Sequence, residues 1–212
     1  MWTPYKNAAG QRIPSVTTIL SRFKESGALL HWAWQQGVDG KDFRETRDKA
    51  ADAGTCAHAM IEAHLKSQNF VREGWTPESL AKGEMAFHAF QTWADGTQLT
   101  PHASEVRMVS EAMQVGGTAD MIVTHNNSFG LLDIKTGAIY ADHLYQVAAY
   151  AMLWDEAHPE QPITGGYHLC RFNRDSGDFS HSYFGELEEA KRGFKLMVEL
   201  YKLDQGIKKR VK

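Results

Sequence analysis

Hydrophobic and polar residues follow two different periods along the chain, and the change falls near residue 96. Before it, apolar residues recur at the three- to four-residue spacing of a helix face. The helices predicted there lie at about 15–20, 29–36, 42–67 and 76–95. Ser15 and Thr76 have side chains suited to helix N-caps, and Gly54 favours a break in the third helix.

After residue 96, short apolar runs alternate with the period of two that is typical of strands. Strands are predicted at 104–109, 117–123, 130–135, 164–172 and 179–184, with helices at about 142–156 and 186–203. This order predicts an α/β fold, in which helices flank a mixed central sheet and the N-terminal part is helical. The chain has no repeat and no Pro/Gly-rich linker. We therefore expect one domain over 1–212, mainly helical over 1–100 and with the sheet core over 101–212.

The composition narrows the class of protein without indicating a function. The chain has 212 residues, is 42% hydrophobic and contains no apolar run near the roughly 20 residues of a membrane span. A cytoplasmic protein without membrane contact is therefore expected. Only Cys56 and Cys170 are present, which excludes a disulfide scaffold and a four-cysteine metal cluster. A net charge of −3 argues against a protein that coats nucleic acid, but it permits a local basic groove around an acidic metal site.

Asp133 and Lys135 introduce charge into an otherwise apolar strand. Because strand side chains alternate, both lie on one face, where they are costly unless they pair or bind something. If the strands at 117–123 and 130–135 form a hairpin, Asp120 comes close to Asp133, and a divalent cation is the simplest neutraliser of the two carboxylates. Such an ion would stabilise charge on a phosphate and activate water, with Lys135 in support. An Asp-x-Lys pair alone, however, is more often a structural salt bridge at a sheet edge.

Several short motifs follow one another along the chain, and together they favour a functional site over a structural salt bridge. They are Pro14–Leu20 (PSVTTIL), Gly54–Glu62 (GTCAHAMIE), Gly116–Asp120 (GGTAD), Leu132–Gly137 (LDIKTG) and Gln146–Tyr150 (QVAAY). In this order they resemble the PD-(D/E)XK nuclease superfamily, and more closely its RecB-like exonuclease branch with its phage-encoded and mitochondrial genome maintenance members. Each motif is weak alone, but the ordered set is specific. The resemblance implies a restriction-endonuclease-like core.

The resemblance also implies roles for single residues. Those that would bind the metal are His58, Asp120, Asp133 and, through its backbone carbonyl, Ile134. The catalytic residues would be Asp120, Asp133 and Lys135. The expected metal is Mg²⁺ or Mn²⁺, and an imidazole ligand favours Mn²⁺. Some relatives hold an iron–sulfur cluster with four cysteines, and no such cluster is expected here.

Other motif residues have a structural alternative beside the functional one. Gln146 and Tyr150 share a helix face and would contact the nucleic-acid backbone or support the lysine, although Tyr150 is equally suited to the core. Glu105, Glu62 and Thr55 are expected as auxiliary residues. The alternatives are an exposed strand charge for Glu105 and a surface side chain for Glu62.

Together these features predict a metal-dependent nuclease that hydrolyses phosphodiester bonds in DNA. The resemblance implies an exonuclease that acts on single strands or DNA ends in recombination, repair or phage genome processing, inside a bacterial or phage-infected cell. Because no helicase or P-loop motif is present, it is expected to act alone or with a recombination or replication partner protein. Two alternatives stay open: a structure- or sequence-specific endonuclease on the same core, and a non-catalytic DNA-binding subunit.

Overall fold

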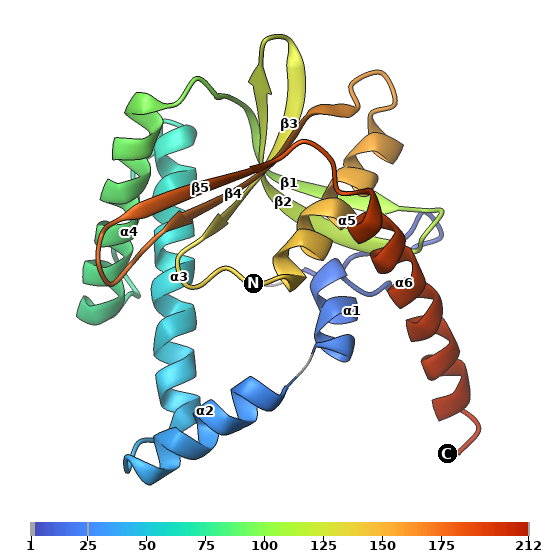
Figure 1. The fold of residues 1–212 in the computed structure, drawn as a ribbon, viewed down its shortest axis with the longest axis horizontal. Coiled ribbons are helices and arrows are strands. Elements are labelled where there is room, and N and C mark those ends of the chain that lie inside the picture. Colours follow the sequence, from blue (N-terminus) through green and yellow to red (C-terminus); the bar gives the residue numbers. More distant parts are fainter. Residues whose placement is uncertain (1–2, 25, 212) are drawn as a thin grey trace.

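The computed structural model describes residues 3–24 and 26–211, and Figure 1 shows how their helices and strands are arranged. The first part of this described chain consists of helices α1 (Val16–Phe23), α2 (Gly27–Val38), α3 (Phe43–Leu65) and α4 (Pro77–Gly96). The second part contains β1 (Thr100–Ser110), β2 (Val115–His125), β3 (Ser128–Lys135), α5 (Asp142–Ala157), β4 (Ile163–Phe172), β5 (Phe179–Phe184) and α6 (Glu188–Lys208). The predicted α/β fold with a helical N-terminal part is confirmed.

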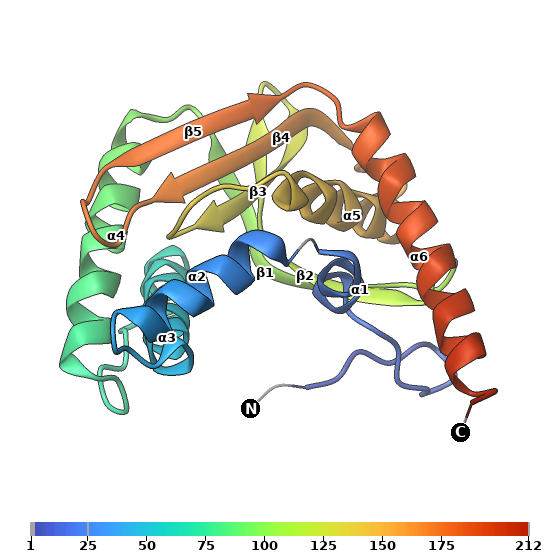
Figure 2. The same cartoon turned by 60° about the horizontal axis from the view of Figure 1, so that its bottom comes forward.

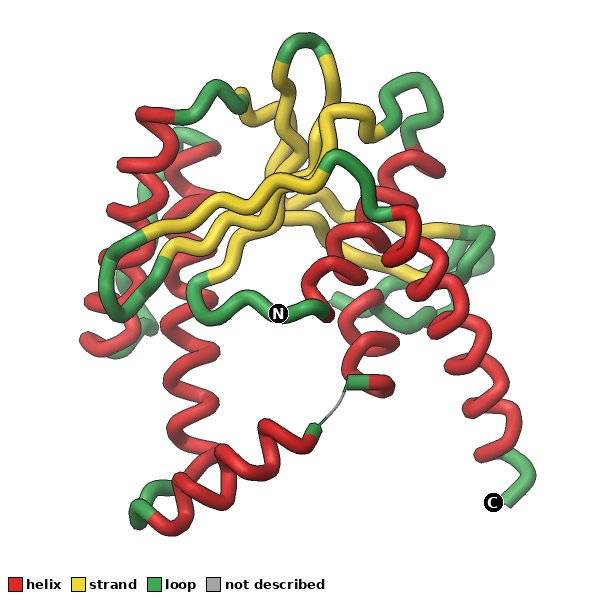
Figure 3. Tube along the Cα trace, in the orientation of Figure 1, coloured by secondary structure: helices red, strands yellow, loops and turns green. Residues whose placement is uncertain are grey.

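The strands of the described chain form a sheet in the order β1-β2-β3-β4-β5. Neighbouring strands run antiparallel except β3 and β4, which are parallel. A parallel pair needs a connection that crosses over the sheet, and α5 provides it. Figure 3 shows the strands as a twisted central layer between two groups of helices, which is the mixed sheet expected from the sequence.

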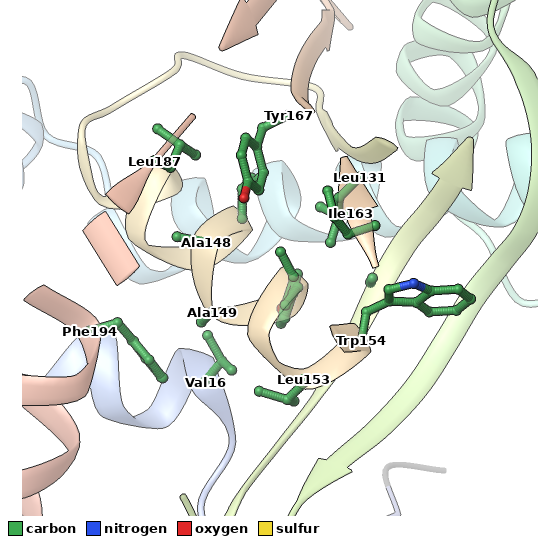
Figure 4. Packing of buried hydrophobic residues seen from close by; sticks show 14 of the residues in the cluster. Val16, Leu131, Ala148, Ala149, Leu153, Trp154, Ile163, Tyr167, Leu187 and Phe194 are labelled. Atoms are coloured by element: carbon green, nitrogen blue, oxygen red, sulfur yellow. The ribbon is translucent and has the colours of Figure 1, made fainter. Parts of the chain in front are cut away.

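Consecutive residues of β3 point to opposite faces of this sheet, and each face has its own core. Leu131 belongs to a core with Leu153 of α5 and Phe194 of α6, part of which Figure 4 shows from close by. Leu132 belongs to the other core, with Phe90 of α4. As Figure 2 shows, α5 therefore lies on one side of the sheet with α6 packed against it, while α3 and α4 lie on the other side.

Local capping chemistry accounts for the starts of two helices, whereas a distant contact explains Gly54. The Oγ of Ser15 accepts a hydrogen bond from the Thr18 backbone N–H at 3.0 Å, and the Oγ1 of Thr76 accepts one from the Ser79 backbone N–H at 3.1 Å.

The predicted break at Gly54 is wrong, because α3 continues through it. A Cβ at this position would lie 3.1 Å from Oγ1 of Thr136, so glycine lets α3 approach the end of β3 closely.

The hydropathy of the chain predicts no membrane contact. No helix among the described residues is both long enough and apolar enough to cross a membrane. The expected single domain over 1–212 stays a prediction, and its residues 1–2, 25 and 212 lie outside the described chain.

Candidate functional site

The site begins where the β1–β2 hairpin twists. Glu105 and Asp120 lie opposite each other in this hairpin, and Glu105 has a φ of 51°, a conformation that residues other than glycine rarely adopt. On β2, Ala119 packs into the core beneath α5, whereas Met121 packs into the core beneath α3 and α4. In a regular strand these two residues would share a face, so the strand must twist at Asp120. The twist brings the carboxylates of Glu105 and Asp120 together beside His58 of α3.

His58, Glu105 and Asp120 form a half-buried cluster of potential metal ligands. One ligand atom from each of them lies within 4.8 Å of the other two. Nδ1 of His58 is 3.7 Å from Oδ1 of Asp120. The other carboxylate oxygen, Oδ2 of Asp120, accepts a hydrogen bond from the Ile134 backbone N–H at 2.7 Å. This bond holds the carboxylate against β3 and directs Oδ1 toward the histidine.

A second row of polar side chains continues from β3 to α5. Nζ of Lys135 lies 2.5 Å from Oδ2 of Asp133 and donates a hydrogen bond to Oε1 of Gln146 at 3.1 Å. Nε2 of Gln146 in turn donates to the hydroxyl of Tyr150 at 3.0 Å. Because Tyr150 is itself buried in the core, each member of this row fixes the position of the next.

Asp133 is the most unusual member of the site, because its carboxylate is buried and incompletely satisfied. The residue is 1% exposed, and although Lys135 is close, neither of its carboxylate oxygens has a partner with hydrogen-bond geometry. A buried charge without such partners is costly, so a cation held next to this carboxylate would stabilise it.

Burial and mutual repulsion shift the protonation equilibria of these acids. Burial, with a smaller contribution from the charge of Asp120, raises the pKa of Glu105 to about 7. Burial also raises the pKa of Asp133 to about 6, with Lys135 opposing the rise and Asp120 adding to it. Burial and the charge of Asp133 raise the pKa of Tyr150 well above its usual range, so its hydroxyl stays protonated.

This donor set fits a divalent cation. A cation would offset the burial and the repulsion that raise the two carboxyl pKa values, and an imidazole beside carboxylate oxygens suits Mn²⁺ as well as Mg²⁺.

The other expected site residues occupy more peripheral positions. Thr55 is exposed, and its hydroxyl donates to the backbone carbonyl of Ala51 within α3. Glu62 forms an ion pair with Lys66, and its charge contributes to the raised pKa of Glu105. Cys56 and Cys170 are both buried, free thiols.

Arg174, in the turn between β4 and β5, belongs to the site's border and has no counterpart among the residues expected from the sequence. Its Nη1 donates a hydrogen bond to Oγ1 of Thr136, the residue after Lys135, at 3.1 Å. The turn carries no recognisable motif, so only the three-dimensional arrangement brings Arg174 to attention.

The comparisons with known proteins agree with this geometry. Residues 5–209 match the model of the PD-(D/E)XK nuclease superfamily, and the chain belongs to this superfamily. Its members are nucleases that use divalent metal ions, so a hydrolytic nuclease with a metal site is the class of protein that the fold and the site define.

Two solved structures are similar to the chain at low sequence identity. One is the "Putative exonuclease" of Eubacterium rectale, with 10% identity, a TM-score of 0.49, and coverage of 73% of this chain and 68% of that one. The other is the protein SSO0001, with 13% identity, a TM-score of 0.35, and coverage of 72% and 74%. No curated protein sequence matches the chain.

Proposed function

We propose that the protein is a metal-dependent DNA exonuclease of the RecB-like branch, which hydrolyses phosphodiester bonds from DNA ends or in single strands. One observation carries the proposal: the ligand atoms of His58, Glu105 and Asp120 converge within 4.8 Å beside the buried pair of Asp133 and Lys135. A metal ion held by acidic ligands can activate water and stabilise charge on a phosphate, and a lysine beside it can neutralise more of that charge.

His58, Asp120 and Asp133, with the backbone carbonyl of Ile134, would hold Mg²⁺ or Mn²⁺. We add Glu105 to this set, because its carboxylate converges on the same point as His58 and Asp120. When bound, the ion would stabilise negative charge on the phosphate and lower the pKa of a nearby water.

Lys135 is the residue of the chain best placed to act on the reacting groups. Its ammonium group lies between Asp133 and the amide of Gln146, and Tyr150 holds that amide in place. Held in this way, Lys135 can orient a water by hydrogen bonding and neutralise charge that develops on the phosphate. Gln146 and Tyr150 are then positioning residues, and Thr55 and Glu62 have at most auxiliary roles.

The finer parts of the proposal follow from the ordered sequence motifs. They favour DNA as the substrate and exonuclease action over cleavage within a strand. They also favour a role in recombination, repair or phage genome processing, where a recombination or replication protein would be the partner.

Digestion of end-labelled single- and double-stranded DNA tests this function. The reactions contain Mg²⁺, Mn²⁺ or EDTA and compare the native protein with Lys135→Ala and with Lys202→Ala, which removes an exposed lysine on α6. We expect the native protein and Lys202→Ala to degrade linear DNA only when metal is present, and Lys135→Ala to be inactive. A parallel reaction contains a covalently closed circle, which an exonuclease leaves intact.

Each outcome assigns a different function. Cutting of the circle would replace the exonuclease with an endonuclease on the same core. Binding of DNA without hydrolysis under any metal condition would indicate a non-catalytic subunit. Equal digestion by the native protein and Lys135→Ala would overturn the assignment of the site.

A further inference from the structure

Arg174 lies at the end of β3, where the backbone and the hydroxyl of Thr136 hold it. Its backbone N–H donates to the Thr136 carbonyl at 3.4 Å, and its Nη1 donates to the Thr136 hydroxyl at 3.1 Å. Thr136 directly follows Lys135 and is itself buried. The two contacts bring the guanidinium to the end of β3 on the side of α3, one residue along the strand from the lysine assigned to catalysis.

The turn that carries Arg174 is held in one conformation. Oδ1 of Asn173 accepts the Asp175 backbone N–H at 2.9 Å, and the Asn173 backbone N–H donates to the Asp178 carbonyl at 2.9 Å. Lys82 of α4 lies 3.3 Å from Oδ1 of Asp175, which ties the turn to a helix. Arg174 is therefore organised before any ligand arrives, which reduces the entropy lost on binding.

Two glycines leave space around the guanidinium. A Cβ on Gly54 would lie 3.8 Å from Nη1 of Arg174, and one on Gly137 would lie 3.7 Å from Nη1 and 3.8 Å from Nη2. His58 follows Gly54 by one helical turn and shares its face of α3. The guanidinium thus lies along the same helix face as the metal-binding histidine, about one turn away.

The charge of Arg174 is not neutralised by the protein. Some other arginines have carboxylate partners: Arg22 pairs with Asp204, Arg72 with Glu84 and Arg171 with Asp178. Within residues 3–24 and 26–211, no carboxylate lies within ion-pair distance of Arg174, and the partner of its Nη1 is a neutral hydroxyl. Its net charge and its other N–H donors stay available for an anion, and a guanidinium matches the geometry of phosphate oxygens.

We propose that Arg174 binds a backbone phosphate of the DNA strand, next to the phosphate at the metal site. The inference rests on the proposed function and adds a binding residue to it. Arg174 contacts the phosphate directly, while Thr136 positions the guanidinium. Lys135 and Arg174 would then act on neighbouring parts of the same strand, which keeps the scissile bond at the metal site.

The salt dependence of DNA binding tests this role without relying on catalysis. Anisotropy of a short fluorescein-labelled single-stranded oligonucleotide is measured over a range of salt concentrations, with Ca²⁺ present and the intactness of the probe checked on a gel. The native protein is compared with Arg174→Gln, Arg174→Lys and the control Arg72→Gln, which removes an exposed, ion-paired arginine. Thermal melts show that each variant is folded.

Loss of one phosphate contact has a defined signature. We expect Arg174→Gln to bind about tenfold more weakly and to lower the slope of log K against log salt by about 0.7. Arg174→Lys should keep the slope but lose part of the affinity, because an ammonium cannot form the bidentate contact. Arg72→Gln should behave like the native protein.

The inference and the proposed function can fail separately. If the native protein degrades DNA but Arg174→Gln shows native affinity and slope, the inference about Arg174 is wrong and the nuclease assignment stands. If the native protein neither binds nor degrades DNA, the proposed function fails as well. A Thr136→Val variant with native affinity would contradict the positioning role of the hydroxyl.

Discussion

Two polar clusters lie on this sheet. They differ in whether their side chains are charged and in whether their polar atoms have hydrogen-bond partners. In one cluster, Nε1 of Trp93 donates to Nδ1 of His181 at 3.3 Å, and Nε2 of His181 lies 2.9 Å from Nδ1 of His168. Burial lowers the pKa of both histidines, that of His168 to about 4, so both rings are neutral at pH 7. In the other, the carboxylate cluster of His58, Glu105 and Asp120 beside Asp133 and Lys135, acidic groups are crowded together and the oxygens of Asp133 lack partners with hydrogen-bond geometry.

The difference separates a structural cluster from a binding one. The histidine cluster has closed its hydrogen bonds and carries no charge, so nothing further is needed to stabilise it. The carboxylate cluster keeps an excess of negative charge in a half-buried place, and its stability improves when a cation binds. Satisfaction of hydrogen bonds, more than the presence of metal-ligating side chains, distinguishes the two.

Substitutions in the two clusters should have very different effects on activity. Asp120→Asn removes a charged ligand while keeping its shape, and we expect a loss of about a thousandfold or more in the rate of DNA hydrolysis. His181→Gln should change that rate by less than about threefold, because it affects only packing and hydrogen bonding. Initial rates with saturating Mn²⁺ measure both, and a large loss in His181→Gln would remove the distinction.

The histidine cluster should make a destabilising contribution to the metal-free protein as the pH falls from about 6.5 to about 4. The folded-state pKa of His168 lies below its ordinary value of 6.5, so the unfolded chain takes up the proton first as the pH drops. We expect a cost of up to about 2 kcal/mol from this residue across that window. The raised pKa values of Glu105 and Asp133 act in the opposite direction, since protonation removes a buried charge at each of these residues.

The difference between the native protein and His168→Gln isolates the histidine contribution. Urea unfolding at several pH values should show that the native protein loses stability relative to the variant as the pH falls below 6.5. Parallel curves for the two proteins would mean that His168 is not buried in its neutral form.

Neutralising Asp133 should stabilise the metal-free fold while it harms function. Burial raises the pKa of this carboxyl, so its charged form costs folding free energy at pH 7. We expect Asp133→Asn to gain about 1 kcal/mol in EDTA, which corresponds to roughly 2–4 °C in Tm. The same variant should lose the rise in Tm that Mn²⁺ gives the native protein. A lower Tm in EDTA would show that the pair with Lys135 outweighs the burial cost.

The smallest expected effect concerns Gly54. A Cβ there meets Thr136 at 3.1 Å, whereas one at Gly37 of α2 meets nothing within 4 Å. Alanine favours a helix by about 1 kcal/mol over glycine, so Gly37→Ala should be slightly stabilising. In Gly54→Ala that gain is offset by crowding, and DNA affinity should fall about threefold if the Thr136 hydroxyl shifts Arg174. Equal gains in Tm for both variants would contradict the close approach of α3.

Local chemistry is enough to predict some of these features from sequence. The start of α4 follows from the hydroxyl of Thr76 before Pro77, and the alternation around Asp133 predicts a strand with its charges on one face. Gly54 is misinterpreted because its low helix propensity is a local property, while its reason lies in Thr136 on another element.

Long-range geometry explains what the sequence indicates only in part or not at all. The resemblance suggests Glu105 as an auxiliary residue, but its place beside His58 depends on the twist of the β1–β2 hairpin at Glu105, and an isolated acid on a strand gives no sign of that twist. Arg174 lies at the site because β4 runs parallel to β3 and ends beside it, a pairing that depends on the α5 crossover. The role of each of these residues stays a proposal that the variants above test.

Titration calorimetry with Mn²⁺ tests the central claim most directly, namely that the carboxylate cluster is a metal site. The native protein, Asp120→Asn and Glu105→Gln are titrated under identical conditions, with His181→Gln as the matched control from the other cluster. We predict that the native protein and His181→Gln bind Mn²⁺ with the same affinity, that Glu105→Gln binds it more weakly, and that Asp120→Asn gives no binding heat. Native binding by Asp120→Asn would contradict the account.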